Sequence, residues 1–277
     1  MDDTRHKGRI TTDGIRIHER ENFAGMHAAG RLAAQILDDV ASLVDVGVGT
    51  GELDDFIRTQ VEKAGATSAT IGYKGYQHAS CISVNHVVCH GIPGAKIPGR
   101  SSDRLKDGDI LNIDVTVVVD GWYGDTSRMF VAGKIKKHTE RLIQVTHDSL
   151  MKGIEAAKPG NTFGDIGRAI QAYAEAHRYS VVRDFCGHGL GRVFHAPPNV
   201  LHYGRAGSGA VLEPGMFFTI EPMINIGTFR TKVLEDDWTA VTADAKLSAQ
   251  FEHSIGITED GCEIFTLSPS GRFHPTY

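Results

Sequence analysis

Apolar side chains in the first quarter of the chain recur with a helical period. From Glu21 to Val44 they return every three or four positions, which predicts an amphipathic helix. Glycines at positions 47, 49 and 51 end this pattern, and a second helix is predicted from Leu53 to about Ala64. In the stretch CISVNHVVCHGIP that follows, apolar positions recur at a shorter spacing than a helix would give. The stretch is also rich in β-formers, so we expect strands there.

The same order of elements returns in the second half. We predict a helix from Thr139 to Ala157, a break at Pro159-Gly160, a helix from Asp165 to Ala176, and then the strand-like stretch SVVRDFCGHGLG. Gly47 and Gly51 match Gly160 and Gly164 at a constant offset. Two interpretations stay open at this point. The match is either a coincidence of common helix–glycine–helix patterns or a duplicated α+β unit whose halves share a site.

The clearest β signal lies between these halves, in DGDILNIDVTVVVDGWYGDTSRMFVAG. Asp120-Gly121 is a favoured two-residue hairpin turn with β-branched runs on both sides. Counting back from the turn places Thr116 opposite Asp125, and Asp114 shares a face with Thr116. Asp114 and Asp125 would then be diagonal neighbours with Cβ atoms roughly 7 Å apart. Such a pair marks either a solvated face or two carboxylates that need a cation between them.

A third strand-rich region begins at Gly215 and includes MFFTIEPMINIG, SAQFEHSIGIT and CEIFTL. Together with the four helices it predicts an α+β fold. Three stretches look like linkers: the first 18 residues, the loop Gly94–Lys106, and the tail after Ser268.

Composition excludes several classes of protein. The 277 residues are 41% hydrophobic and 23% charged, as in an ordinary globular protein. With 29 basic and 34 acidic residues the net charge is −5, so there is no basic surplus for nucleic acid. No apolar run is long enough to span a bilayer and the charged beginning is not a secretory signal, so we expect a cytoplasmic protein. The four cysteines form no CxxC pair and no GxSxG motif occurs, which disfavours zinc-knuckle, thioredoxin-type and serine-hydrolase sites.

Acidic side chains in apolar, strand-like settings are the main chemical signal. Burying several carboxylates costs much free energy unless they share a cation. Oxygen ligands with one nitrogen suit manganese, iron, cobalt or zinc, and paired divalent ions are a known device for hydrolysis. The candidate ligands are Asp114, Asp125, His188 in FCGHGLG, Glu221 in FFTIEPM and Glu252 in AQFEHSIGI. His90 in VVCHGIP and His195 in RVFHAPP remain as non-ligand histidines that could donate hydrogen bonds to a substrate.

Six motifs in order give a specific resemblance. CHGIP, NIDVTVVVDGWYGDTSRMF, CGHGLG, RVFH, FTIEPM and SAQFEHS resemble the motif series of the type I methionine aminopeptidases, from about residue 20 to residue 265. The resemblance implies the pita-bread fold, in which pseudo-twofold α+β halves surround a central antiparallel sheet. We therefore expect a single catalytic domain over residues 19–277, preceded by a short extension over residues 1–18.

The resemblance also implies roles for particular residues. Asp125 and Glu252 would bridge two metal ions, Asp114 would hold one ion, and His188 with Glu221 would hold the other. Glu221 would also act as general base, and His90 and His195 would contact the substrate. The implied methionine pocket consists of Tyr73, Tyr76, Cys81, Phe194 and Trp238, and the implied monovalent cation site (sodium or potassium) consists of Asn85, Val87 and Ser248. Two departures from the family are Thr70, where many relatives carry cysteine, and the long loop Gly94–Lys106.

The function that this resemblance implies is hydrolytic removal of the N-terminal methionine from nascent proteins, with a small second residue preferred. The expected cofactors are two divalent ions (cobalt, manganese, iron or zinc). We expect a monomer that meets the ribosome transiently and binds neither membrane nor specific nucleic acid. Two alternatives stay open: a proline-directed aminopeptidase or prolidase on the same fold, and a non-catalytic scaffold.

Overall fold

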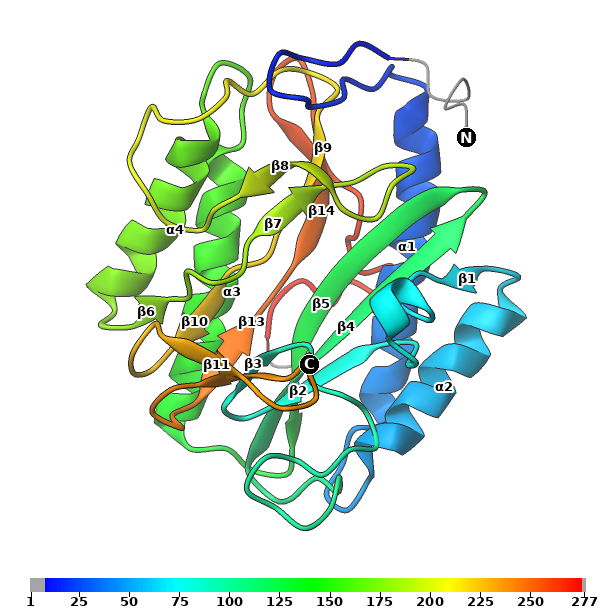
Figure 1. Cartoon of the computed structure of the whole chain (residues 1–277), viewed down its shortest axis with the longest axis vertical. Coiled ribbons are helices and arrows are strands. Elements are labelled where there is room, and N and C mark those ends of the chain that lie inside the picture. Colours follow the sequence, from blue (N-terminus) through cyan, green and yellow to red (C-terminus); the bar gives the residue numbers. More distant parts are fainter. Residues whose placement is uncertain (1–7, 276–277) are drawn as a thin grey trace.

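Two pairs of helices flank a set of short sheets in the computed structural model, which describes residues 8–275. Figure 1 shows α1 and α2 on one side of the hairpin strands and α3 and α4 beside the later strands. The bounds are α1 Asn22–Val40, continued by a 3-10 turn η1 Ala41–Leu43, α2 Thr50–Lys63, α3 Lys137–Ala156 and α4 Phe163–Ala176. All four predicted helices are confirmed. No helix in the described part of the chain has both the length and the apolar character needed to cross a membrane.

Three helices begin two or three residues earlier than their patterns predict: α2, α3 and α4. The helix α2 starts at Thr50, so Gly51 lies inside its first turn rather than in the break before it. A Cβ at Gly51 would lie 3.1 Å from the Cα of Gly94, so the glycine allows the loop 94–106 to pack closely against this helix. Close packing, and not chain flexibility, explains this glycine.

The central hairpin has the predicted register. Strands β4 (Asp109–Val119) and β5 (Trp122–Ala132) pair so that Thr116 lies opposite Asp125. Asp120 and Gly121 have φ values of 49° and 80°, the left-handed conformation that a type I′ turn requires. One face of the hairpin packs into the core below α1 and α2 with the side chains of Leu111, Ile113, Val115 and Val117. The opposite face carries the polar residues Asn112, Asp114 and Thr116.

The remaining strands form small sheets around this hairpin. One sheet joins β1 (Thr67–Ser68) and β2 (Cys81–Val84) to β4 and β5; a second has the order β11 (Thr231–Val233), β12 (Ala240–Thr242), β3 (Val87–Cys89). A third has the order β13 (Ser248–Gln250), β10 (Met223–Asn225), β6 (Ser180–Val181). The fourth has the order β15 (Cys262–Ile264), β14 (His253–Ile257), β9 (Phe217–Ile220), β7 (Gly187–Gly189), β8 (Ala196–Val200). The chain passes from one of these sheets to another at residues 221–222 and again at 251–252.

Each half of the molecule has its own hydrophobic core. Buried side chains of α1 and α2 pack with those of β2, β4 and β5 in one cluster, and those of α3 and α4 pack with β9, β10, β13 and β14 in another. This arrangement agrees with the duplicated α+β interpretation and leaves the space between the halves for a site.

The three linker-like stretches are anchored in the fold, so that interpretation was wrong for the described residues. Ile15 is only 1% exposed and packs in the second core, and the ring of His18 stacks on Phe217 at 4.2 Å. In the loop 94–106, Arg100 donates hydrogen bonds to both carboxylate oxygens of Asp109. In the tail, the Ser270 N–H donates to buried Asp38 at 3.1 Å. A few buried or paired side chains anchor each stretch to the rest of the fold. The composition of the stretches gives no sign of this anchoring. Residues 1–7 lie outside the described part, and the domain boundary at residue 18 stays a prediction.

Candidate metal centre and substrate cavity

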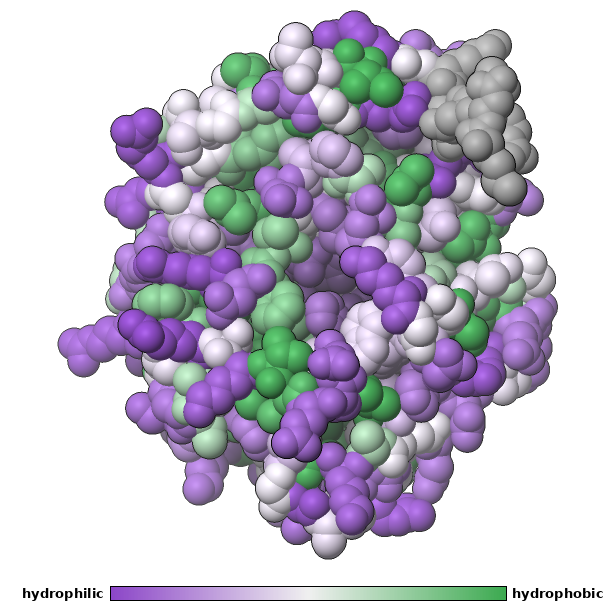
Figure 2. Space-filling model, viewed as in Figure 1, coloured by the Kyte–Doolittle hydropathy of each residue, from purple (hydrophilic) through white to green (hydrophobic). Residues whose placement is uncertain are grey.

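A cavity of about 830 Å³ opens between the two halves. Figure 2 shows the hollow near the centre of the face in view, surrounded by mostly hydrophilic residues. The structure brings the five candidate ligands, both candidate histidines and the five predicted pocket residues to this one cavity. These are Asp114, Asp125, His188, Glu221, Glu252, His90, His195, Tyr73, Tyr76, Cys81, Phe194 and Trp238.

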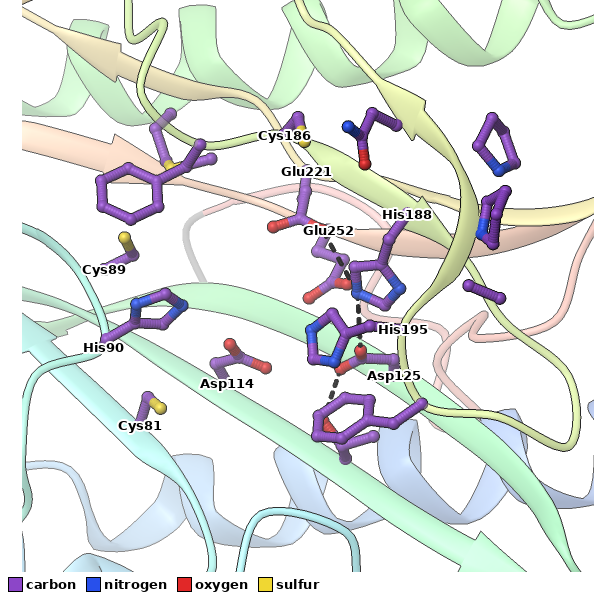
Figure 3. Close-up of a pocket in the computed structure, with 18 of the residues that line it drawn as sticks. Cys81, Cys89, His90, Asp114, Asp125, Cys186, His188, His195, Glu221 and Glu252 are labelled. Carbon is purple, nitrogen blue, oxygen red and sulfur yellow. Dashed lines mark hydrogen bonds and ion pairs between the residues drawn. The ribbon is translucent and has the colours of Figure 1, made fainter. Parts of the chain in front are cut away.

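Three of the candidate ligands form a compact buried group. One ligand atom each of Asp125, His188 and Glu252 lies within 4.8 Å of the other two. The His188 Nε2 atom lies 3.5 Å from Asp125 Oδ2 and 3.7 Å from Glu221 Oε1. Figure 3 shows these side chains pointing toward one another from β5, β7 and the two breaks between sheets. The bridge between Ser127 and Glu252 holds β5 against the second half, so the group spans both halves.

Asp114 lies beside this group on β4, in the diagonal position that the hairpin register predicts. Its Oδ1 atom is buried and has no hydrogen-bond partner among residues 8–275. Burial and the negative charges of Asp125 and Glu221 raise the pKa of Asp114 well above its usual value. An unpartnered oxygen facing other carboxylates is the arrangement expected of a cation ligand.

Glu221 and Glu252 are also acids that lie buried beside other negative charges. Burial, followed by repulsion from Asp125, Glu221 and Asp114, raises the pKa of Glu252 well above its usual range. Burial also raises the pKa of Glu221 to about 7, although the positive charge of His188 acts in the opposite direction. The four carboxylates therefore repel one another without a shared positive charge, and together with the imidazole they form a donor set that fits divalent cations.

Hydroxyl and amide groups fix the directions of these acids. Thr116 donates a 2.7 Å hydrogen bond to Asp125, and Thr219 donates one of 2.8 Å to Glu221. Gln250 Nε2 lies 3.4 Å from the other oxygen of Glu221. Our sequence analysis did not assign Thr219 or Gln250. Thr219 has a usable signal, because it lies two residues before the acid that it contacts. Gln250 has none, because the acid that it contacts is 29 residues away.

The two candidate histidines lie on different sides of the cavity (Figure 3). Burial and the positive charge of His188 lower the pKa of His195 to about 4. Burial also lowers the pKa of His90, whose ring packs edge-on against Phe185 and Trp238. Both rings are therefore neutral at pH 7, and each keeps one N–H to donate.

The predicted pocket walls consist of two aromatic pairs. The rings of Tyr76 and Trp238 lie 4.9 Å apart, as do those of Tyr73 and Phe194. Burial strongly raises the pKa of the Cys81 thiol, so it stays uncharged. The Tyr76 hydroxyl donates its hydrogen to the main-chain oxygen of Ser80. An uncharged wall of rings and a thiol suits a flexible thioether side chain.

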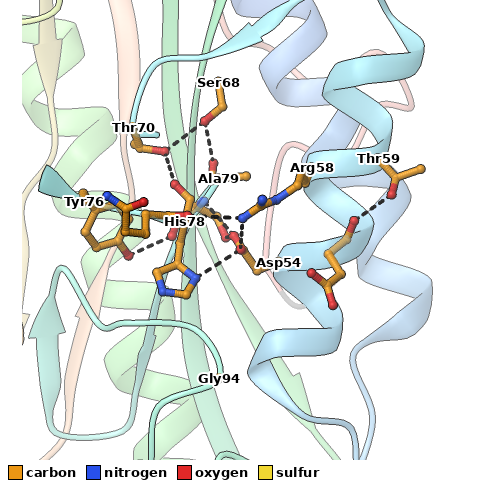
Figure 4. A network of polar contacts seen from close by, with 12 residues as sticks. Asp54, Arg58, Thr59, Ser68, Thr70, Tyr76, His78, Ala79 and Gly94 are labelled. Carbon is orange, nitrogen blue, oxygen red and sulfur yellow. Dashed lines mark hydrogen bonds and ion pairs between the residues drawn. The ribbon is translucent and has the colours of Figure 1, made fainter. Parts of the chain in front are cut away.

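A polar network behind this wall fixes its position (Figure 4). Asp54 on α2 accepts hydrogen bonds from the main-chain N–H and the hydroxyl of Ser80, at 2.8 and 2.7 Å. Thr70 donates to the main-chain oxygen of His78 at 2.6 Å. The segment from Tyr76 to Cys81 is thus held between α2 and the bend that follows β1.

The three residues assigned to a monovalent cation lie outside this cavity but close to one another. The Ser248 N–H donates to the main-chain oxygen of Asn85 at 2.9 Å, and the Ser248 hydroxyl is buried without a partner among the described residues. Asn85 has a φ of 57° and lies in the turn between β2 and β3. Val87 is the first residue of β3.

Comparisons with known proteins agree with this site. The model of metallopeptidase family M24 matches residues 24–259. A methionine aminopeptidase of Rickettsia prowazekii is 54% identical over 95% of this chain and 99% of its own length. The Escherichia coli methionine aminopeptidase is 50% identical over 91% of this chain and 94% of its own length.

Solved structures give the same result. The crystal structure of methionine aminopeptidase from Rickettsia prowazekii covers 91% of this chain and 100% of its own, with a TM-score of 0.88 at 54% identity. A prolidase of Pyrococcus horikoshii has a TM-score of 0.70 at 19% identity, covering 91% of this chain and 63% of its own, and this likeness shows the fold alone. The pita-bread fold is thereby confirmed, and the chain belongs to metallopeptidase family M24, among its methionine aminopeptidases.

Proposed function

We propose that this protein hydrolyses the peptide bond after an N-terminal methionine, in peptides and in nascent proteins. The observation that supports it most is one cavity that combines two features. It contains four acids and a histidine that suit divalent cations, and it has an aromatic wall that suits a methionine side chain. The relatives that are 50–54% identical over more than 90% of the chain are methionine aminopeptidases, which favours this activity over the proline-directed alternative. A full set of ligand-type residues disfavours the scaffold alternative.

The donor set fits two divalent cations. Asp125 and Glu252 would be shared by both, Asp114 would hold one, and His188 with Glu221 would hold the other. When bound, such ions supply positive charge that activates water and polarises a carbonyl group. Manganese, iron, cobalt and zinc all accept these ligands. We also propose a sodium or potassium ion at Asn85, Val87 and Ser248, supported by the buried, unpartnered hydroxyl of Ser248.

The chain's own side chains have separate tasks in this reaction. The rings of Tyr73, Tyr76, Phe194 and Trp238, with Cys81, bind the methionine side chain away from water. His195 and His90, being neutral, each donate an N–H toward the scissile group, where negative charge grows during attack.

Glu221 receives a proton from the attacking water and returns it to the leaving amine. In the metal-free protein, burial raises the pKa of Glu221 to about 7. Thr219 and Gln250 each contact one oxygen of Glu221 and so fix the direction of its carboxylate. A cation bound beside the carboxylate would lower this pKa.

The natural substrate places the protein near the site of protein synthesis. Chains that carry an N-terminal methionine emerge from ribosomes, so we propose action as a monomer in the cytoplasm, with transient contact to the ribosome. We also propose a preference for a small second residue.

Mass spectrometry of a Met-Ala-Ser peptide tests the proposal. The purified protein would be freed of metal and incubated with manganese, iron, cobalt or zinc, with a Xaa-Pro peptide as a control. We expect loss of a single methionine only when metal is present, and no cleavage of the Xaa-Pro peptide. Asp125→Ala should lose both bound metal and activity. Cleavage of the Xaa-Pro peptide alone, or none by folded protein with any metal, would contradict the proposal.

A further inference from the structure

The main chain at Glu221 lies in a gap between two sheets. Strand β9 ends at Ile220 and belongs to the sheet with β7 and β14, whereas β10 begins at Met223 and pairs with β6 and β13. The next residue, Pro222, has no N–H group. The N–H of Glu221 therefore has no partner in either sheet ladder, and a buried N–H needs one.

Glu252 occupies the equivalent gap between β13 and β14. Its N–H donates to the main-chain oxygen of Ser127 at 3.1 Å, so ordinary main-chain bonding holds this glutamate. At Glu221 the acceptor is a side chain instead. The N–H of Glu221 donates to the Nε2 atom of His202, also at 3.1 Å.

His202 is built rigidly into this position. It is 0% exposed and follows the end of β8, where Val200 pairs with Gly187 of β7. Helix α4 packs closely against the same segment from the other side. A Cβ at Gly167 would lie only 2.5 Å from the Tyr203 oxygen and 2.7 Å from the Leu201 oxygen.

The contact also determines which nitrogen of the ring carries the proton. A nitrogen that accepts an N–H must be unprotonated, so the Nδ1 atom of His202 carries the hydrogen. Nδ1 is buried and has no hydrogen-bond partner within residues 8–275. The ring thus makes a single polar contact there, and that contact is with the main chain of Glu221.

We propose that His202 is a positioning residue, whose Nε2 atom fixes the main chain of Glu221 and thereby the direction of its carboxylate. This inference rests on the proposed function, in which Glu221 is a metal ligand and a general base. Nothing in this role requires His202 to touch substrate or metal. Groups that orient a metal ligand through a hydrogen bond change metal affinity roughly 10- to 100-fold when removed. Because His202 acts through the main chain, we expect about a tenfold effect, at the lower end of that range.

Calorimetric titration with Mn²⁺ tests this proposal in three variants of the metal-free protein. His202→Phe keeps the ring size but removes the acceptor, and His202→Gln places an oxygen near the position of Nε2. His147→Phe is the matched control, a buried histidine on α3 that packs against Phe251. We expect His202→Phe to bind Mn²⁺ about tenfold more weakly, with a lower kcat and an unchanged KM for Met-Ala-Ser. His202→Gln should recover most of both, and His147→Phe should bind Mn²⁺ like the wild type.

Nuclear magnetic resonance of the wild-type imidazole nitrogens gives a test that needs no variant. We expect His202 to be the neutral Nδ1–H form in the metal-free protein. A proton on Nε2, or wild-type Mn²⁺ affinity in folded His202→Phe, would overturn the proposal, as would failure of His202→Gln to improve on His202→Phe. These measurements do not depend on peptide cleavage. If they succeed while the wild type cleaves no peptide, the proposed function alone fails.

Discussion

At the scale of single residues, neutral histidines avoid repulsion from the divalent cations proposed for this site. A protonated imidazole beside bound divalent ions would be repelled, whereas a neutral one still donates one N–H. Burial and the nearby charge of His188 keep His195 neutral at any pH well above 4. The ring lies 4.2 Å from that of His188 and stacks on Tyr73, so its direction is fixed.

His195→Ala should lower kcat/KM for Met-Ala-Ser by about 10²–10³, as is typical for the loss of one donor to developing negative charge. Bound metal should stay at the wild-type level, because His195 is not among the proposed ligands. Peptide kinetics and metal analysis of the same preparation check this. His138→Ala, at an exposed position of α3, is the control and should change neither quantity. A loss of metal equal to the loss of activity would show that His195 acts as a ligand instead.

The sequence shows some of these residues and hides others for a physical reason. Asp114, Glu221 and Glu252 stand out because acids are rarely placed in apolar strands without a partner. His202 does not stand out, because its partner is a main-chain N–H 19 residues away and no local pattern records that contact.

At the scale of elements, a buried carboxylate of the helix α2 helps to hold one wall of the cavity. Asp54 is buried and accepts both the N–H and the hydroxyl of Ser80. It also lies 3.4 Å from His78 Nδ1. The wall residues Tyr76 and Cys81 lie on either side of these contacts along the chain, so Asp54 couples the position of the helix to the shape of the pocket (Figure 4).

Asp54→Ala should lower the free energy of unfolding by about 1–3 kcal/mol, because it leaves the buried N–H and hydroxyl of Ser80 unpaired. It should also raise KM for Met-Ala-Ser more than it lowers kcat, since the pocket wall moves and the metal ligands do not. Urea denaturation and steady-state kinetics measure the two effects. Asp55→Ala, exposed on the same helix, should leave both near the wild-type values. An effect on kcat alone would show that Asp54 does not act by positioning the pocket wall.

Long periodic elements and stretches rich in β-formers could be predicted, whereas isolated short strands could not. The four helices and the hairpin repeat their pattern over many residues, so the prediction does not depend on any single position. Strands β8, β11 and β12 are three to five residues long and lie outside the stretches rich in β-formers, so the sequence does not predict them. Their pairing comes from contacts with distant strands.

The whole molecule depends on contacts that cross between its parts. Buried Arg128 of β5 pairs with Asp38 of α1, and Asp38 also accepts hydrogen bonds from Ser268 and the Ser270 N–H in the C-terminal tail. One carboxylate thus connects a helix, the central hairpin and the tail. The motif order suggests two related halves, but it contains no information on these three-way contacts.

This connection should make stability depend on pH in a predictable direction. Burial alone would raise the pKa of Asp38, but the contacts with Arg128, Ser268 and Ser270 outweigh it and hold the pKa below its usual value of 3.8. The stabilisation is therefore fully present above pH 3.8 and is lost as the pH falls through the lower, folded-state pKa. Asp38→Asn removes the carboxylate that pairs with buried Arg128 and should cost about 3–5 kcal/mol at pH 7.

Urea denaturation of metal-free wild type and Asp38→Asn, from pH 7 to pH 3, measures this dependence. The difference in unfolding free energy should stay constant down to about pH 4 and then shrink, because the wild-type carboxyl becomes neutral like the amide. Other acids titrate in both proteins, so their contributions cancel in the difference. Asp39→Asn, whose wild-type carboxylate accepts from Gln35, is the control and should show only a small difference. A difference for Asp38→Asn that persists unchanged to pH 3 would mean that packing, and not the ion pair, ties these three segments together.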